Sequence, residues 1–147
     1  MRKFFVAMVS VACVLMSVSC ETAEGFLMPD QHYSLAQIRK AIGAVSGKPR
    51  HISQNEREFL SPYFSRKPSP TFDPEKTFER LYAHFWILGD RRPYDIRVQV
   101  LVEHKDEDGY SVEGEDVNLS KKVADELKDK LVQGQDGSNV IDSFRPF

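Results

Sequence analysis

The sequence predicts an α+β domain in which N-terminal helices pack on a small, mostly antiparallel sheet, in the order α-α-α-β-β-α-β. Three observations support this class. Helix-start signals precede apolar residues at helical spacing in the first half of the chain, alternation with a period of two begins at Tyr94, and an acidic turn follows at residues 106–109. The 147 residues are 41% hydrophobic and 29% charged, which is typical of a globular protein with room for one domain.

Two helices are expected to begin at capping-box patterns. Ser34 with Gln37 precedes an apolar stripe that stops at Gly47. Ser53 with Glu56 repeats the pattern and is expected to open a second helix rich in aromatic residues. Both helices would come before the first strand.

A third helix is expected to begin at Asp73. This residue can serve as N-cap, and Pro74 suits the first helical position. A rotation of about 100° per residue places a broad apolar arc on one side of this helix. The members of the arc are Phe78, Leu81, Tyr82, Phe85, Trp86 and Leu88.

The second half of the chain predicts a β-hairpin followed by a helix and a strand. Residues 94–103 alternate between apolar and polar side chains, and a second alternating segment begins at Tyr110. Ser120 is expected to cap the helix, which would end at Gly134 and Gly137. Residues 139–145 are expected to form the last strand of the sheet.

The N-terminus predicts export. Arg2 and Lys3 follow the initial methionine, and the apolar run at residues 4–18 is shorter than the roughly 20 residues needed to span a bilayer. Residues 1–19 are therefore expected to be a signal peptide. Residues 20–33 lack periodicity and are expected to form a tether, and residues 34–147 a single α+β domain.

The segment Ser17-Val18-Ser19-Cys20 resembles the lipobox of bacterial lipoproteins, although Ser17 stands where that pattern usually carries Leu. The resemblance covers residues 1–20. It implies that Cys20 becomes the acylated N-terminus, carrying fatty acid such as palmitate, and anchors the protein to a membrane of the cell envelope. Glu21 after the cysteine implies the outer membrane, with the domain facing the periplasm. The alternative is ordinary signal-peptidase cleavage near Cys20 and secretion.

Cysteine usage and charge narrow the possible functions. The only cysteines are Cys13 and Cys20, so the exported domain cannot form an internal disulfide. Loss of the signal peptide leaves 18 basic and 22 acidic residues, a net charge of −4, which argues against nucleic acid as a partner. No catalytic residues, metal ligands or cofactors are expected, because the four histidines are scattered and no nucleophile motif occurs.

The favoured interpretation is a lipid-anchored envelope module that binds or assembles with another protein and has no catalytic activity. Expected partner contacts are Trp86, Arg91 and Arg92, together with an open strand edge. The alternative is a periplasmic carrier of an amphipathic or acyl ligand, with a cavity beneath Tyr82 and Phe85. A hydrolase assembled from distant segments is a remote third hypothesis.

Overall fold

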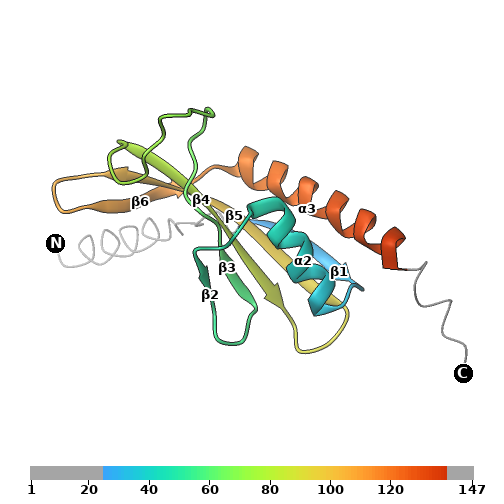
Figure 1. The fold of residues 1–147 in the computed structure, drawn as a ribbon. Helices are drawn as coiled ribbons and strands as arrows, with labels where there is room; N and C mark the ends of the chain where they lie inside the picture. The colour runs from blue at the N-terminus through green and yellow to red at the C-terminus, as the bar shows by residue number, and fades with distance from the viewer. Residues whose placement is uncertain (1–24, 139–147) are drawn as a thin grey trace, which may run out of the picture.

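The structure, a computed structural model, describes residues 25–138. Within that range the elements follow the order β1, α2, β2, β3, β4, β5, β6, α3 (Figure 1). The helices are α2 (Leu35–Ser46) and α3 (Val117–Ser138). The strands are β1 (Phe26–Gln31), β2 (His51–Ile52), β3 (Glu58–Leu60), β4 (Glu79–Leu88), β5 (Tyr94–Lys105) and β6 (Tyr110–Glu115). The α+β class is confirmed.

The strands of the described range form one antiparallel sheet whose centre is the long β4–β5 hairpin. These two strands pair over ten residues, from Glu79 opposite His104 to Leu88 opposite Asp95. β3 and then β2 extend the sheet on the far side of β4. β1 and β6 both pair with the other edge of β5, β1 near its start and β6 near its end. The prediction of a mostly antiparallel sheet is confirmed.

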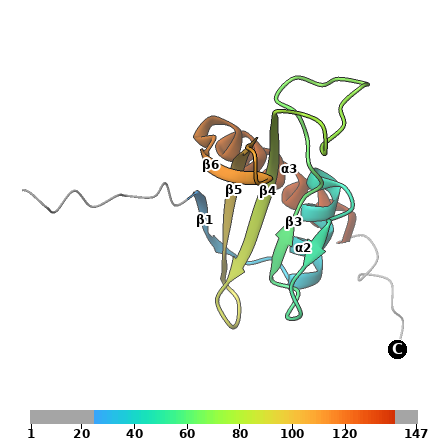
Figure 2. The same cartoon turned by 90° about the vertical axis from the view of Figure 1, so that its left-hand side faces the viewer.

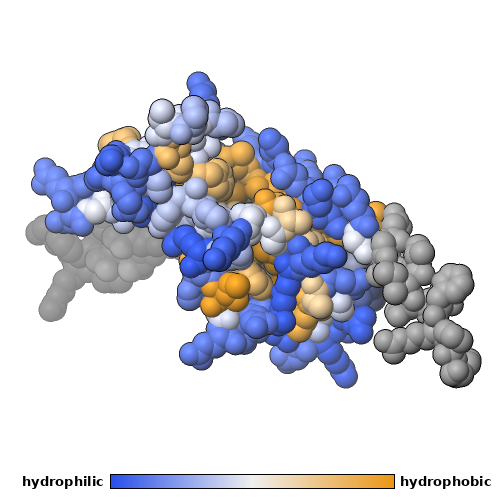
Figure 3. All heavy atoms as spheres, in the orientation of Figure 1, coloured by the Kyte–Doolittle hydropathy of each residue, from blue (hydrophilic) through white to orange (hydrophobic). Residues whose placement is uncertain are grey.

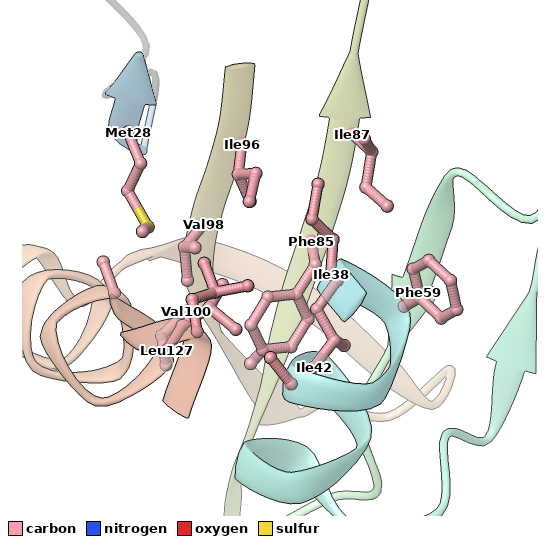
Figure 4. Close-up of a cluster of buried hydrophobic side chains, with 14 of the residues drawn as sticks. Met28, Ile38, Ile42, Phe59, Phe85, Ile87, Ile96, Val98, Val100 and Leu127 are labelled. Carbon is pink, nitrogen blue, oxygen red and sulfur yellow. The ribbon is translucent and has the colours of Figure 1, made fainter. Parts of the chain in front are cut away.

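The two helices lie on the same side of the sheet, as the two views of the ribbon show (Figures 1 and 2). Alternate residues of β4 and β5 point toward them, so that Phe85 and Val98 are fully buried. Ile42 of α2 and Leu127 of α3 pack into the same cluster (Figure 4). Each such side chain contributes roughly 1.5–3 kcal/mol through burial, so this core fixes which face of the sheet is covered.

The first predicted helix is confirmed as α2, including its cap. Ser34 Oγ accepts a hydrogen bond from Gln37 N at 3.2 Å, and Gln37 Oε1 accepts one from Ser34 N at 2.8 Å. The helix ends at Gly47, whose φ of 73° is left-handed. The hairpin of β5 and β6 around an acidic turn is also confirmed.

The second predicted helix is wrong. His51–Ile52 and Glu58–Leu60 instead form a short antiparallel hairpin, β2–β3. Ser53 Oγ does accept backbone hydrogen bonds, from Arg57 N at 3.3 Å and Glu58 N at 3.0 Å, but it closes a turn rather than opening a helix. The same side-chain chemistry serves caps and turns. The described part therefore has one N-terminal helix before the long strands, not three.

The third predicted helix is also wrong beyond its first turn. Asp73 caps that turn, since its Oδ1 accepts a hydrogen bond from Glu75 N at 3.1 Å. The chain then extends, and Glu79–Leu88 becomes the central strand β4. The apolar residues of this run satisfy a period of two as well as a helical period, and pairing with β3 and β5 on both sides favours the strand.

Three further boundaries differ from expectation. Phe26–Gln31 pairs with β5 as β1, so the tether predicted over residues 20–33 is wrong for this part. Asp116, rather than Ser120, caps α3: its Oδ1 accepts a hydrogen bond from Leu119 N at 3.0 Å. α3 also continues through both glycines expected to end it and reaches Ser138. The strand predicted at residues 139–145 lies outside the described residues.

Candidate partner-binding face and helix groove

The face of the sheet opposite the helices carries a distinct set of side chains. Alternation along a strand sends every second residue of β4 and β5 away from the core. We call this set the open face. Its members are Tyr82, His84, Trp86, Arg97, Gln99 and Leu101, and the strand register places Tyr82 opposite Leu101, His84 opposite Gln99, and Trp86 opposite Arg97.

Trp86 and His84 form a stacked pair on the open face. Their ring centroids lie 3.5 Å apart with 27° between the planes, and both side chains are partly exposed. His84 Nε2 also lies 2.5 Å from Glu58 Oε1 on β3. Burial lowers the pKa of His84, and the hydrogen bond with Glu58 offsets only part of that effect. The stack therefore presents a neutral imidazole and an indole at neutral pH.

Arginines lie at the end of the sheet formed by the β4–β5 turn. Arg91 and Arg92 lie exposed in that turn. Arg57, from the β2–β3 turn, donates to the carbonyl oxygens of Gly89 and Asp90 and so joins the two turns. Its guanidinium lies 5.6 Å from the ring centroid of Tyr94, on the side of the sheet that the helices cover. We call Arg57, Arg91, Arg92 and Arg97, together with Trp86, the basic end.

Arg97 is an incompletely satisfied member of the basic end. Its Nε is buried and has no hydrogen-bond partner among the described residues. Leaving a buried donor unpaired costs on the order of 1–3 kcal/mol. Acidic side chains also lie near the basic end, but Asp95 Oδ1 already accepts from Asp30 N at 3.0 Å, and Glu58 pairs with His84.

A cluster of tyrosines and arginines supports the other end of the open face. The Arg80 guanidinium lies between the rings of Tyr63 and Tyr110, at 3.8 and 3.5 Å from their centroids. Its Nε donates to Glu103 Oε2 at 2.7 Å, and both side chains are about one-tenth exposed. These contacts hold β4, β5 and β6 together beneath the exposed surface.

A second surface feature lies along the seam of the two helices, where apolar surface is visible in Figure 3. Three adjoining pockets of about 300, 260 and 290 Å³ follow this seam and share lining residues. They form one open trough, which we call the helix groove. Its principal residues are Ala41, Ala44 and Val45 of α2 and Glu126, Lys130 and Leu131 of α3. At its far end the groove reaches Phe64 and Phe85.

The arrangement of Tyr82 and Phe85 bears on the carrier hypothesis. Phe85 points into the core and reaches the helix groove, whereas Tyr82 lies on the open face against Tyr63, with ring centroids 5.8 Å apart. One cavity beneath both residues is therefore not formed. The apolar space next to Phe85 is an open groove at the small end of the range for ligand pockets.

Histidine–carboxylate pairs occur without the rest of a catalytic site. His84 pairs with Glu58, and His104 pairs with Glu79 and Glu113. Within residues 25–138 no hydroxyl hydrogen-bonds to either histidine, and no group of three or more His, Cys, Asp or Glu residues is arranged to hold a metal ion. The described pairs thus offer proton acceptors but no adjacent nucleophile.

The structure brings the three predicted partner contacts to one end of the sheet. Trp86 precedes the β4–β5 turn, and Arg91 and Arg92 lie within it. Cys20 lies outside the described residues. Sequence reasoning missed Arg57 and Arg97, because residues 53–64 were assigned to a helix and the register of β4 with β5 was not foreseen. The alternation around Arg97 was the available signal.

Comparisons with known proteins give no relative from which a function for the site could be inferred. No protein-family model, no curated protein and no solved structure matches the chain. In the part of the chain that the structure describes, no helix combines the length and apolarity needed to cross a membrane.

Proposed function

We propose that the protein is a lipid-anchored binding module of the bacterial cell envelope, without catalytic activity of its own. The observation that carries this proposal is the basic end, where the indole of Trp86 and four arginines lie at one end of the sheet. Tryptophan and arginine contribute most often to binding energy at protein interfaces. The lipobox-like segment ending at Cys20 supports the location, an outer membrane with the domain facing the periplasm.

The chemistry of the basic end favours a protein partner that presents carboxylates beside an apolar surface. Arg91 and Arg92 are exposed guanidinium groups that can bind carboxylates in a two-pronged manner. Trp86 supplies a flat apolar anchor next to them. The helix groove would suit an acyl ligand only if it could enclose the chain, and its open form favours the binding module over the carrier.

The test is site-specific crosslinking in native membranes. A photoreactive residue in place of Trp86 should crosslink one envelope protein, and the double charge reversal Arg91→Glu/Arg92→Glu should reduce that product about tenfold or more, as expected when charged contacts are lost. Lys121→Glu/Lys122→Glu is the matched control, since these two consecutive lysines are exposed on α3.

The two double variants change the net charge equally, so they separate a site from a general charge effect. Loss of crosslinking in the arginine variant alone supports the basic end as the binding site. Equal loss of the crosslinked product in both variants would refute this site. The site would also be refuted if a photoreactive residue at position 78 gave a crosslinked product and one at position 86 gave none. Phe78 is the appropriate reference because it is an exposed aromatic residue at the other end of β4.

A further inference from the structure

Two arginines at one end of the open face rest on the same tyrosine ring, but only one of them has carboxylate partners. The guanidinium carbons of Arg80 and Arg50 lie 3.8 and 4.3 Å from the ring centroid of Tyr63. Arg80 pairs with Glu103 and Glu75. Among the residues that the structure describes, Arg50 forms no ion pair. The cluster thus holds two neighbouring positive charges and leaves one of them without a carboxylate.

Arg50 is held in place without a ligand. Its guanidinium also lies 4.5 Å from the ring centroid of Tyr82, its Nε donates to Ser61 O at 3.1 Å, and its backbone N donates to Leu60 O at 2.9 Å. In the described part of the chain neither of its Nη groups donates a hydrogen bond, and the residue is exposed. An arginine that is already fixed loses little conformational entropy when a carboxylate binds to its two Nη groups.

The charges around Arg50 leave it available to an anion. The charged and titratable side chains near it on this part of the sheet are Glu58, Glu75, Glu103, Arg80, His51 and His84. The carboxylates among them bond to Arg80 or His84, and none reaches Arg50 at ion-pair distance. Coulomb attraction falls with distance, so a carboxylate in contact with Arg50 gains more from it than it loses to these more distant carboxylates.

Arg50 and the basic end lie at opposite ends of the open face. Arg50 rests on Tyr82, and Trp86 follows four residues later on β4, about 13 Å away at 3.3 Å per residue. His84 lies midway and stacks on Trp86. In an extended segment, residues two and four apart point to the same side. Such a segment, lying along β4, would place one residue at Arg50, the second after it on the stacked rings, and the fourth after it at the basic end.

We propose that Arg50 binds a carboxylate of the partner protein, on the same extended segment that occupies the basic end. The segment carries two acidic residues four positions apart and an apolar residue midway between them. One carboxylate binds the Nη groups of Arg50, the other binds arginines of the basic end, and the apolar side chain covers the rings of His84 and Trp86. This inference rests on the proposed function, to which it adds a second charged contact and the spacing of the partner's acidic residues.

The sole tryptophan of the chain provides the readout, because Trp86 is partly exposed between the two proposed contacts. The probe is the acetylated and amidated peptide Asp-Ser-Leu-Ser-Asp, titrated into protein purified from membranes in detergent and followed by tryptophan fluorescence. Replacing either Asp of the peptide with Asn should weaken its binding about fivefold, as expected when one two-pronged contact with arginine is lost. In Arg50→Gln one of these two losses should disappear, since that carboxylate no longer has its partner.

Lys48→Gln is the matched control, because it removes one positive charge from an exposed residue two positions before Arg50. Both losses should remain in this variant. The proposal is overturned if both losses also remain in Arg50→Gln, if Lys48→Gln abolishes one of them, or if none of the peptides changes the fluorescence.

The double variant Arg91→Glu/Arg92→Glu separates this proposal from the proposed function. If one loss disappears in that variant while both remain in Arg50→Gln, the basic end keeps its role and only the contact at Arg50 is overturned. If both losses remain in every variant, the result counts against the basic end as well.

Discussion

Arg80 and Glu103 form the most enclosed ion pair of the described part, and their energetics set a prediction at the residue scale. The Arg80 guanidinium is buried between two tyrosine rings. Glu103 is its enclosed charged acceptor, whereas Glu75, which also pairs with Arg80, is exposed. Glu103→Gln should lower the free energy of unfolding by about 2 kcal/mol, because a hydrogen bond to a charged group contributes about 1.5–3 kcal/mol and the exposed Glu75 compensates only part of its loss. Urea unfolding measures this directly. Glu107→Gln, in the exposed hairpin turn, should change stability by less than about 0.5 kcal/mol; a similar small change for Glu103→Gln would contradict the assigned role.

His84 gives stability a pH dependence that can also be tested at one residue. Burial lowers the pKa of His84 in the folded chain below its ordinary value of 6.5, so the unfolded chain binds this proton more readily. The stabilising effect of the neutral ring is complete above pH 6.5 and is lost as pH falls toward the folded pKa. The groups that face it are Glu58, Arg50 and His51.

Wild type should therefore lose more stability than His84→Gln between pH 8 and pH 5, as measured by urea unfolding at each pH. His32→Gln serves as the control, since His32 is exposed. If the free energy of unfolding changes with pH to the same extent in wild type and His84→Gln, then folding does not lower the pKa of His84.

At the scale of elements, α2 contains two glycines that should respond in opposite directions to the same substitution. Gly43 is inside the helix and Gly47 follows it with a φ of 73°, and at both positions an added Cβ would meet open space. Gly43→Ala should raise the unfolding free energy by about 0.5–1 kcal/mol through helix propensity. Gly47→Ala should lower it by about 1 kcal/mol, because the left-handed conformation is strained for alanine. Thermal unfolding compares the two; changes of the same sign would contradict this account of how α2 ends.

The elements also show what the sequence could predict. α2 and the β5–β6 hairpin carry local signals, a reciprocal cap in one and strict alternation around an acidic turn in the other, and these signals agree with the tertiary structure. β4 could not be assigned in this way, because its aromatic run fits two periods and only pairing with β3 and β5 decides between them. The same ambiguity concealed part of the candidate site. Trp86, Arg91 and Arg92 were predicted as contacts, but Arg97 joins them through strand register.

At the scale of the whole molecule, the proposed anchor and the observed fold together restrict where the domain can sit. β1 begins at Phe26, so only residues 21–25 would connect an acylated Cys20 to the sheet. Five residues span at most about 18 Å. The domain would thus lie close to the bilayer, within reach of partners that are themselves membrane-bound, and this confinement raises the local concentration of both.

The corresponding prediction concerns Cys20. Cys20→Ala should move the protein from the membrane fraction to the soluble fraction, because each buried CH₂ of an acyl chain contributes about 0.8 kcal/mol and several such chains hold the protein firmly. The variant should still give the crosslinked product from position 86 once its concentration is raised, since the basic end is unchanged. Mass spectrometry of wild type should find an acylated residue 20 at the mature N-terminus. Cys13→Ala is the control, because it lies within the segment expected to be removed. An unmodified residue 20 would refute the anchor, and so would equal membrane association of Cys20→Ala and wild type. Neither result would bear on the basic end, which the crosslinks from position 86 test separately.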